Sequence, residues 1–200
     1  MSKVKLFNVD NREERLMSDE DLQRLIAVLD HDRNRTAALA VKFLLLSSLR
    51  VSEALQARWS DLSPDRHTLT LPASNKSKRR RAVPLSDAAI AVIQQLGTEG
   101  KSEWLFVSSR SGERLTTINK AWQRIRQAAD LPQTRLHDLR HQAASHMLNS
   151  GYSLYVVQQV LGHSDQSVTQ RYAHLSTETL QGAANSVGTY LEKALGNSGK

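Results

Sequence analysis

The chain has 200 residues, 40% of them hydrophobic, which is enough for one domain of ordinary size with a buried core. Its formal net charge of +7 indicates a polyanionic partner, with nucleic acid as the first candidate. The absence of cysteine excludes disulfides, thiolate zinc sites and a cysteine nucleophile. The longest apolar run, residues 39–46, contains Lys42 and is too short to span a bilayer, and no signal-peptide stretch opens the chain. We therefore expect cytoplasmic residence and no membrane partner.

The first part of the chain is predicted to be helical. Residues 1–15 are polar and charged, and we interpret them as a linker. Ser18 and Asp21 have the spacing of a capping box, and apolar residues follow at helical spacing as far as Leu29. A second helix is predicted over residues 35–47. Because this helix is apolar on most faces, we expect it to be central.

A short third helix and a β-hairpin are predicted next. Ser52 can cap a helix that runs through Ala57. Residues 67–71 and 79–83 alternate like strands, and residues 75–78 form the turn between them.

The rest of the chain is again mostly helical. An amphipathic helix is predicted over residues 87–96 and a short apolar strand over residues 104–107. The helices predicted after it span residues 117–129, 137–149, 154–161, 166–173 and 177–195. The predicted fold class is therefore mainly α with a small antiparallel β-sheet, an α+β architecture.

Basic, imidazole and hydroxyl side chains occur in an order that suits phosphoryl transfer without a metal ion. Arginine forks match phosphate oxygens, lysine or histidine can move protons, and a tyrosine hydroxyl can attack phosphorus. The segments are Arg50-Val51-Ser52-Glu53, a basic turn at Lys76, His137-Asp138-Leu139-Arg140-His141, Leu161-Gly162-His163 and Arg171-Tyr172-Ala173-His174-Leu175. One such residue alone would mean little, whereas the whole ordered set is a specific signal.

At these segments the chain resembles the catalytic domain of the tyrosine recombinase (phage integrase) family, and the resemblance covers residues 16–180. It implies the fold of that catalytic domain, which agrees with the predicted elements. It also implies that residues 1–15 are the linker from an N-terminal DNA-clamping (core-binding) domain. Residues 181–200 would be a C-terminal helix or tail that could contact a neighbouring subunit. An excised fragment and a naturally short protein are both open, and we favour the fragment.

The resemblance implies catalytic roles for the members of the ordered set. Tyr172 would be the nucleophile, and Arg50 and Arg140 would clamp the scissile phosphate. His163 would donate a hydrogen bond to that phosphate. His137 would exchange a proton with the tyrosine or bond the phosphate.

The basic turn is predicted to combine acid catalysis with DNA contact. Lys76 matches the family's turn lysine, which would protonate the departing 5′-oxygen. Lys78 competes for this role because the family's turns often carry glycine after the lysine, where Ser77 and Lys78 stand here. A charge run is usually a solvated or DNA-facing surface. The predicted DNA-binding residues are Lys78, Arg79, Arg80 and Arg81.

Glu53 lies one helical turn after Arg50, where similar recombinases have an acidic residue. We expect it to hold an arginine or a histidine rather than to react, and the alternative is an ordinary solvated glutamate. No metal ion or organic cofactor is predicted. His137 and His141 have a spacing that metals use on helices, but no glutamate follows His137 and no cysteine could complete a site.

The predicted activity is site-specific DNA recombination, by integration or excision, through a 3′-phosphotyrosyl intermediate. The expected partners are double-stranded DNA and three further copies of the chain in a tetramer on synapsed DNA, with weak or no association without DNA. Two alternatives are a type IB topoisomerase-like relaxation and a DNA-binding relative that does not cleave. The target site, the direction of the reaction, accessory proteins and cleavage in cis or in trans stay open.

Overall fold

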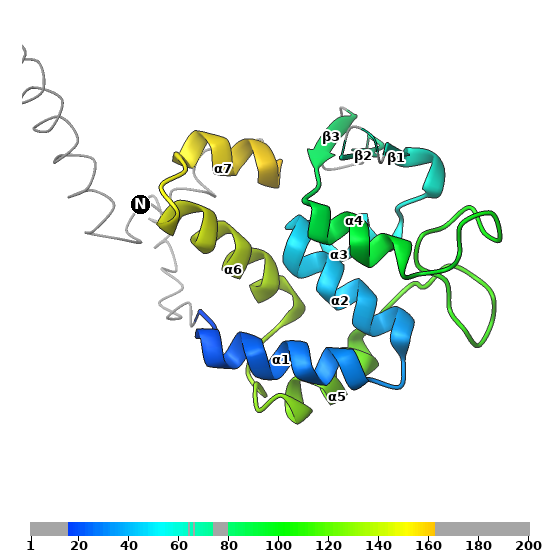
Figure 1. The fold of residues 1–200 in the computed structure, drawn as a ribbon, viewed down its shortest axis with the longest axis horizontal. Helices are drawn as coiled ribbons and strands as arrows, with labels where there is room; N and C mark the ends of the chain where they lie inside the picture. Colours follow the sequence, from blue (N-terminus) through cyan, green and yellow to red (C-terminus); the bar gives the residue numbers. More distant parts are fainter. Residues whose placement is uncertain (1–15, 64, 66, 74–79, 163–200) are drawn as a thin grey trace, which may run out of the picture.

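The computed structural model describes residues 16–63, 65, 67–73 and 80–162. Predictions for the remaining residues, including the linker and the helices after residue 163, lie outside this part of the chain. The elements are α1 (Asp19–His31), α2 (Arg35–Ser47), α3 (Val51–Leu55), the 3-10 helix η1 (Trp59–Asp61), β1 (Leu62–Ser63), β2 (Thr68–Leu71), β3 (Arg81–Pro84), α4 (Asp87–Gln94), α5 (Asn119–Ala128), α6 (Leu136–Asn149) and α7 (Leu154–Leu161). The predicted fold class is confirmed: the chain is mainly helical, with one small antiparallel sheet at the edge of the molecule (Figure 1).

Helix α2 is the centre of the fold, as its sequence predicted. It contacts α1, α3, α4, α5 and α6, and Figure 1 shows it running through the middle of the molecule. Residues on most of its faces are buried, among them Phe43, which packs its ring 5.6 Å from that of Phe106. Burial of an apolar helix on all sides fixes its position strongly. The residues that follow its C-terminus are therefore held in place.

The start of α1 confirms the predicted capping box. The backbone N–H of Asp21 donates to Ser18 Oγ at 3.2 Å, and the backbone N–H of Ser18 donates to Asp21 Oδ2 at 3.0 Å. Each bond satisfies a donor that the helix itself leaves without a partner. Just before it, the backbone of Met17 exchanges two hydrogen bonds with the side-chain amide of Gln142 on α6.

The sheet has the order β1-β2-β3, with both pairs antiparallel. The predicted hairpin is present as β2 and β3, with Leu69 opposite Val83 and Leu71 opposite Arg81. Strand β1, of two residues, was not predicted because so short a segment shows no alternation.

The prediction of a strand over residues 104–107 is wrong. Trp104 pairs with Arg58 and Val107 pairs with Arg114, each in an isolated bridge. Leu105 and Phe106 between them are fully buried, which explains the apolar run. The chain bends at Leu105 and Phe106 and its two ends pair with different partners, so no ladder forms.

Helices α6 and α7 form a second, smaller core that lies against the first. Ala144, Val157 and Leu161 are its buried members. α6 also packs on α2, and α7 ends on the side of the molecule that carries β3 (Figure 1). Within the part of the chain that the structure describes, no helix is long and apolar enough to cross a bilayer.

Candidate active site

The turn between α2 and α3 positions Arg50. Ser48 is the C-cap that follows α2; it has a left-handed backbone with φ 57°, and its N–H donates to the Leu44 carbonyl. Non-glycine residues adopt this conformation rarely, so it turns the chain sharply at a defined place. Arg50 follows as the N-cap of α3, with its side chain 36% exposed. The arginine predicted to clamp phosphate is thus accessible at the edge of a rigid core.

Glu53 holds Arg50 at both its backbone and its side chain. The Arg50 backbone N–H donates to Glu53 Oε2 at 3.0 Å, and Arg50 Nη1 donates to Glu53 Oε1 at 2.9 Å. Arg81 Nη2 donates to both carboxylate oxygens, each at 3.0 Å. With a side chain only 20% exposed, Glu53 lies between two arginines and is not a solvated helix glutamate.

The charge of Glu53 is stabilised by these donors. Burial by itself raises the pKa of this carboxyl, but the Arg50 backbone N–H and the Arg81 guanidinium outweigh burial, so the pKa lies below its ordinary value of 4.5. Glu53 is therefore ionised at neutral pH, and its negative charge fixes the two guanidinium groups.

We expect the Glu53→Gln variant to be less stable than the wild type at pH 7 by about 2 kcal/mol, since hydrogen bonds to charged groups are lost. A carboxyl with a lowered pKa in the folded state stabilises the protein above its ordinary pKa, and this contribution disappears as the pH falls through the lower folded value. As the pH is lowered below about 4.5, the free energy of unfolding should therefore fall less in the variant than in the wild type. Urea unfolding from pH 7 to pH 3 measures both effects.

Glu103→Gln is the matched control, because Glu103 is 57% exposed and pairs only with the exposed Arg58 among the described residues. Its free energy of unfolding at pH 7 should stay within about 0.5 kcal/mol of the wild-type value. Equal free energies for the wild type and the Glu53 variant at pH 7 would contradict the assigned role of Glu53.

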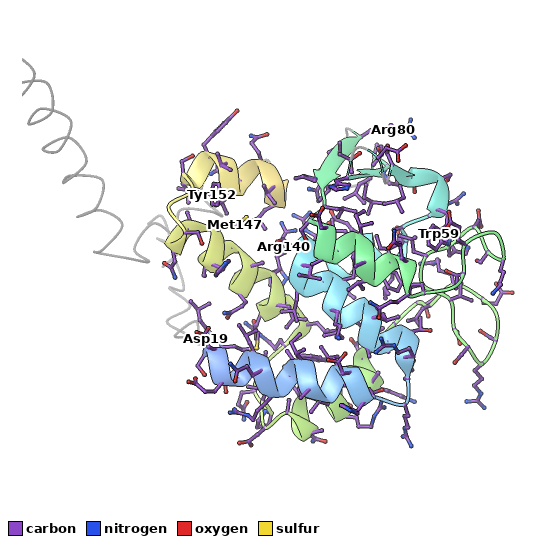
Figure 2. All side chains as sticks on the ribbon, viewed as in Figure 1. Asp19, Trp59, Arg80, Arg140, Met147 and Tyr152 are labelled. Atoms are coloured by element: carbon purple, nitrogen blue, oxygen red, sulfur yellow. The ribbon has the colours of Figure 1, made fainter. Side chains whose placement is uncertain are left out.

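Arg140 joins three segments that lie far apart in the sequence. Its Nη1 donates to the Ser48 carbonyl at 2.7 Å and its Nη2 donates to the Leu161 carbonyl at 2.8 Å. The residue is 4% exposed, and Figure 2 shows it where α6 faces the end of α2. Ser48 precedes Arg50 by two residues and Leu161 precedes His163 by two residues. One guanidinium on α6 therefore holds the turn before Arg50 and the end of α7 together.

No residue pattern predicts that these two carbonyl groups bond Arg140. Ser48 has a positive φ, and a serine carries no sequence signal for that conformation. Every residue has a backbone carbonyl group, so no residue type in the sequence marks an acceptor of this kind.

His137 lies in the first turn of α6, beside His141. The two rings meet edge to face with centroids 4.6 Å apart. Partial withdrawal of the ring from water lowers the pKa of His137, and positive charge at His141 and Arg140 lowers it further. A neutral imidazole at neutral pH can accept a proton, which suits the predicted exchange with a tyrosine. Among the described residues, no three histidine or carboxylate side chains lie close enough to hold a metal ion.

Gly162 ends α7 in the left-handed conformation, with φ 65°, and the helix covers residues 154–161 as predicted. His163 follows it directly. The predictions for Lys76, Lys78, Arg79, His163 and Tyr172 all lie outside the described residues.

Two residues of the basic run are described, and they differ in exposure. Arg80 is exposed at the outer end of the sheet (Figure 2). The side chain of Arg81 is only 16% exposed and points toward Glu53. Contact of either residue with DNA stays a prediction.

Known proteins resemble this chain in both sequence and structure. The integrase of Haemophilus phage HP1 is 30% identical over 186 residues, which are 90% of this chain and 49% of that protein. The tyrosine recombinase XerD of Proteus mirabilis is 32% identical over 179 residues, which are 82% of this chain and 56% of that protein. The chain thus spans about half the length of these curated relatives.

The fold agrees with these sequence matches. The solved catalytic domain of the bacteriophage HP1 integrase superposes with a TM-score of 0.66 at 30% identity, over 86% of this chain and 95% of that one. The Tn1549 transposon integrase in complex with transposon right end DNA superposes with a TM-score of 0.75 at 16% identity, over 90% of this chain and 68% of that one. The model of the phage integrase family matches residues 15–179. The chain belongs to the phage integrase family.

Proposed function

We propose that this chain cuts and rejoins DNA strands in site-specific recombination, with Tyr172 as the nucleophile. The observation that carries the proposal is the position of Arg140, whose guanidinium bonds the backbone beside Arg50 and the backbone beside His163. Arg140 thereby lies next to the turn that carries Arg50, and both guanidinium groups are suited to phosphate. Family membership and the recombinases among the relatives support the same activity.

The reaction balances without an external energy source. The Tyr172 oxygen loses its proton, with His137 as acceptor, and forms a bond to phosphorus. The bond from phosphorus to the 5′-oxygen breaks, and Lys76 or Lys78 supplies the proton of the leaving hydroxyl. Arg50 and Arg140 neutralise the charge that develops on the non-bridging oxygens. A 5′-hydroxyl of a second strand then reverses the step and releases the tyrosine.

The partners follow from this chemistry. Double-stranded DNA is the substrate, and its phosphates complement the net charge of +7. Exchange of two strand pairs needs four such sites, so the chain would act as a homotetramer on synapsed DNA and would associate weakly without it. Its place of action would be the cytoplasm, at the nucleoid of a bacterium or on phage DNA.

The test uses a pool of nicked duplexes with a randomised central segment, at low salt and with EDTA present. We expect the chain to form a covalent protein–DNA adduct that EDTA does not diminish, and to join the bound strand to an added 5′-hydroxyl strand. Relaxation of supercoiled plasmid without joining to a partner strand would instead indicate topoisomerase-like activity. Binding of the pool without any adduct would indicate a DNA-binding protein that does not cleave.

A further inference from the structure

Arg81 belongs to the inner face of the sheet, although it stands in a run of basic residues. Side chains alternate along a strand, so Arg81 shares a face with Val83, which is fully buried. Its partner across the strands is Leu71, which is 4% exposed. This face rests on the core, whereas a DNA-facing residue would lie on the opposite one.

The guanidinium of Arg81 is wedged between two segments of the site. One terminal nitrogen, Nη2, bonds both oxygens of Glu53 on α3. The other, Nη1, is buried and has no hydrogen-bond partner within the described residues. It lies so close to Gly162 that a Cβ atom on that glycine would stand 2.0 Å from it. Arg81 thus touches both α3 and the turn that leads into His163.

Packing alone does not explain an arginine here. Leucine or valine would continue the apolar face of Leu69, Leu71 and Val83 without withdrawing a charge from water. A buried donor without a partner costs free energy as well. An arginine can bond both carboxylate oxygens of Glu53, and an apolar residue cannot. Glu53 in turn accepts hydrogen bonds from Arg50.

We propose that Arg81 is a positioning residue of the strand-cleavage site. It holds the Glu53 carboxylate in the orientation that fixes Arg50, and it sets the distance between α3 and the Gly162 turn. The residue also begins strand β3, which directly follows the basic turn with the two candidate general acids. Arg81 therefore ties α3 to the Gly162 turn, and this role rests on the proposed function.

The test compares Arg81→Met with Arg80→Met, a neighbour that is exposed. For Arg81→Met we expect the rate of adduct formation at saturating nicked duplex to fall about 10- to 100-fold, because misplaced catalytic groups slow the reaction. Its affinity for the duplex should change less than about twofold, because no phosphate contact is removed. For Arg80→Met we expect weaker binding to the duplex. The slope of log affinity against log salt concentration should also become shallower by about one ion. Arg81→Lys, which can still reach Glu53 with one donor, should recover part of the rate.

Amide hydrogen exchange provides a readout that does not depend on activity. In Arg81→Met, exchange should accelerate at the Arg50 amide, which donates to Glu53, and at the Gly162 amide, which donates to Gln158. The amides of α1 and α5 should be unchanged. If Arg81→Met unfolds, the same local comparison is made on Arg81→Lys.

The outcomes separate this inference from the proposed function. Weaker DNA binding by Arg81→Met with unchanged exchange at both amides would make Arg81 a DNA-contacting residue and overturn the inference. If the wild type forms no adduct, the proposed function fails, and exchange alone then decides whether Arg81 holds the two segments together.

Discussion

Replacement of Arg140 by lysine is expected to slow DNA cleavage by about 10²- to 10³-fold, the usual loss when one donor to a developing oxyanion is removed. Arg140 bonds two backbone carbonyl groups from a nearly fully buried position. A lysine carries a single ammonium group on a flexible stem, so it cannot bond both carbonyl groups and also present a planar fork to phosphate. The rate should be measured at saturating nicked duplex, so that a change of affinity does not enter.

The same substitution should destabilise the fold by about 1–3 kcal/mol, because at least one buried carbonyl group loses its donor. Urea unfolding measures this loss. Arg135→Lys is the matched control at the start of the same helix, since the Arg135 side chain is 60% exposed and pairs with Asp138, which lysine can also reach. We expect that variant to keep its stability within about 0.5 kcal/mol. A wild-type cleavage rate for Arg140→Lys on DNA that it binds would contradict the clamp.

Replacement of Gly162 by alanine should reduce cleavage about 100-fold, because a shift of roughly 1 Å in catalytic groups has effects of this size. The new Cβ would stand 2.0 Å from Arg81 Nη1 and 2.3 Å from Arg81 Cζ. The guanidinium would have to leave Glu53, or the turn before His163 would have to move. Either shift disturbs the site.

Gly151→Ala separates this clash from backbone strain. Both glycines have positive φ, 65° at Gly162 and 87° at Gly151, but a Cβ on Gly151 would have no neighbour within 4 Å among the described residues. Each alanine should therefore cost about 1–2 kcal/mol of stability through its left-handed backbone. Only Gly162→Ala should also lose cleavage at saturating DNA.

A double variant identifies the cause of that loss. If the clash with Arg81 is responsible, Gly162→Ala combined with Arg81→Met should be little worse than either single change, because both act on one contact. Fully additive losses in rate would show that the glycine acts independently of Arg81.

The sequence predicted elements well where a local signal exists. The capping box at Ser18 and the apolar faces of residues 35–47 gave the first two helices and the central place of the second. The helix predicted over residues 154–161 ends at Gly162, which adopts a backbone that other residues avoid. The prediction of a strand over residues 104–107 failed because burial produces the same apolar run whether or not a ladder forms.

Long-range contacts of charged residues were harder to predict. Glu53 was correctly expected to hold an arginine, since it follows Arg50 by one turn, but its second partner Arg81 is 28 residues away. Arg81 was grouped with the DNA-binding residues because a charge run is usually solvated, and while its contact with DNA stays a prediction, its ion pair with Glu53 was not foreseen. A signal for its inward direction existed in the alternation of β3, where Arg81 and Val83 share a face. The charge pattern hid this alternation.

Peptide mapping of the covalent adduct identifies the residue that bonds DNA, which we propose to be Tyr172. The adduct on the nicked duplex pool would be digested with protease and nuclease, and the tyrosine that carries the nucleotide would be identified by mass spectrometry. We predict that the nucleotide lies on Tyr172 and that Tyr172→Phe forms no adduct on DNA to which it still binds. A nucleotide on Tyr152, Tyr155 or Tyr190, or an undiminished adduct in Tyr172→Phe, would contradict the account.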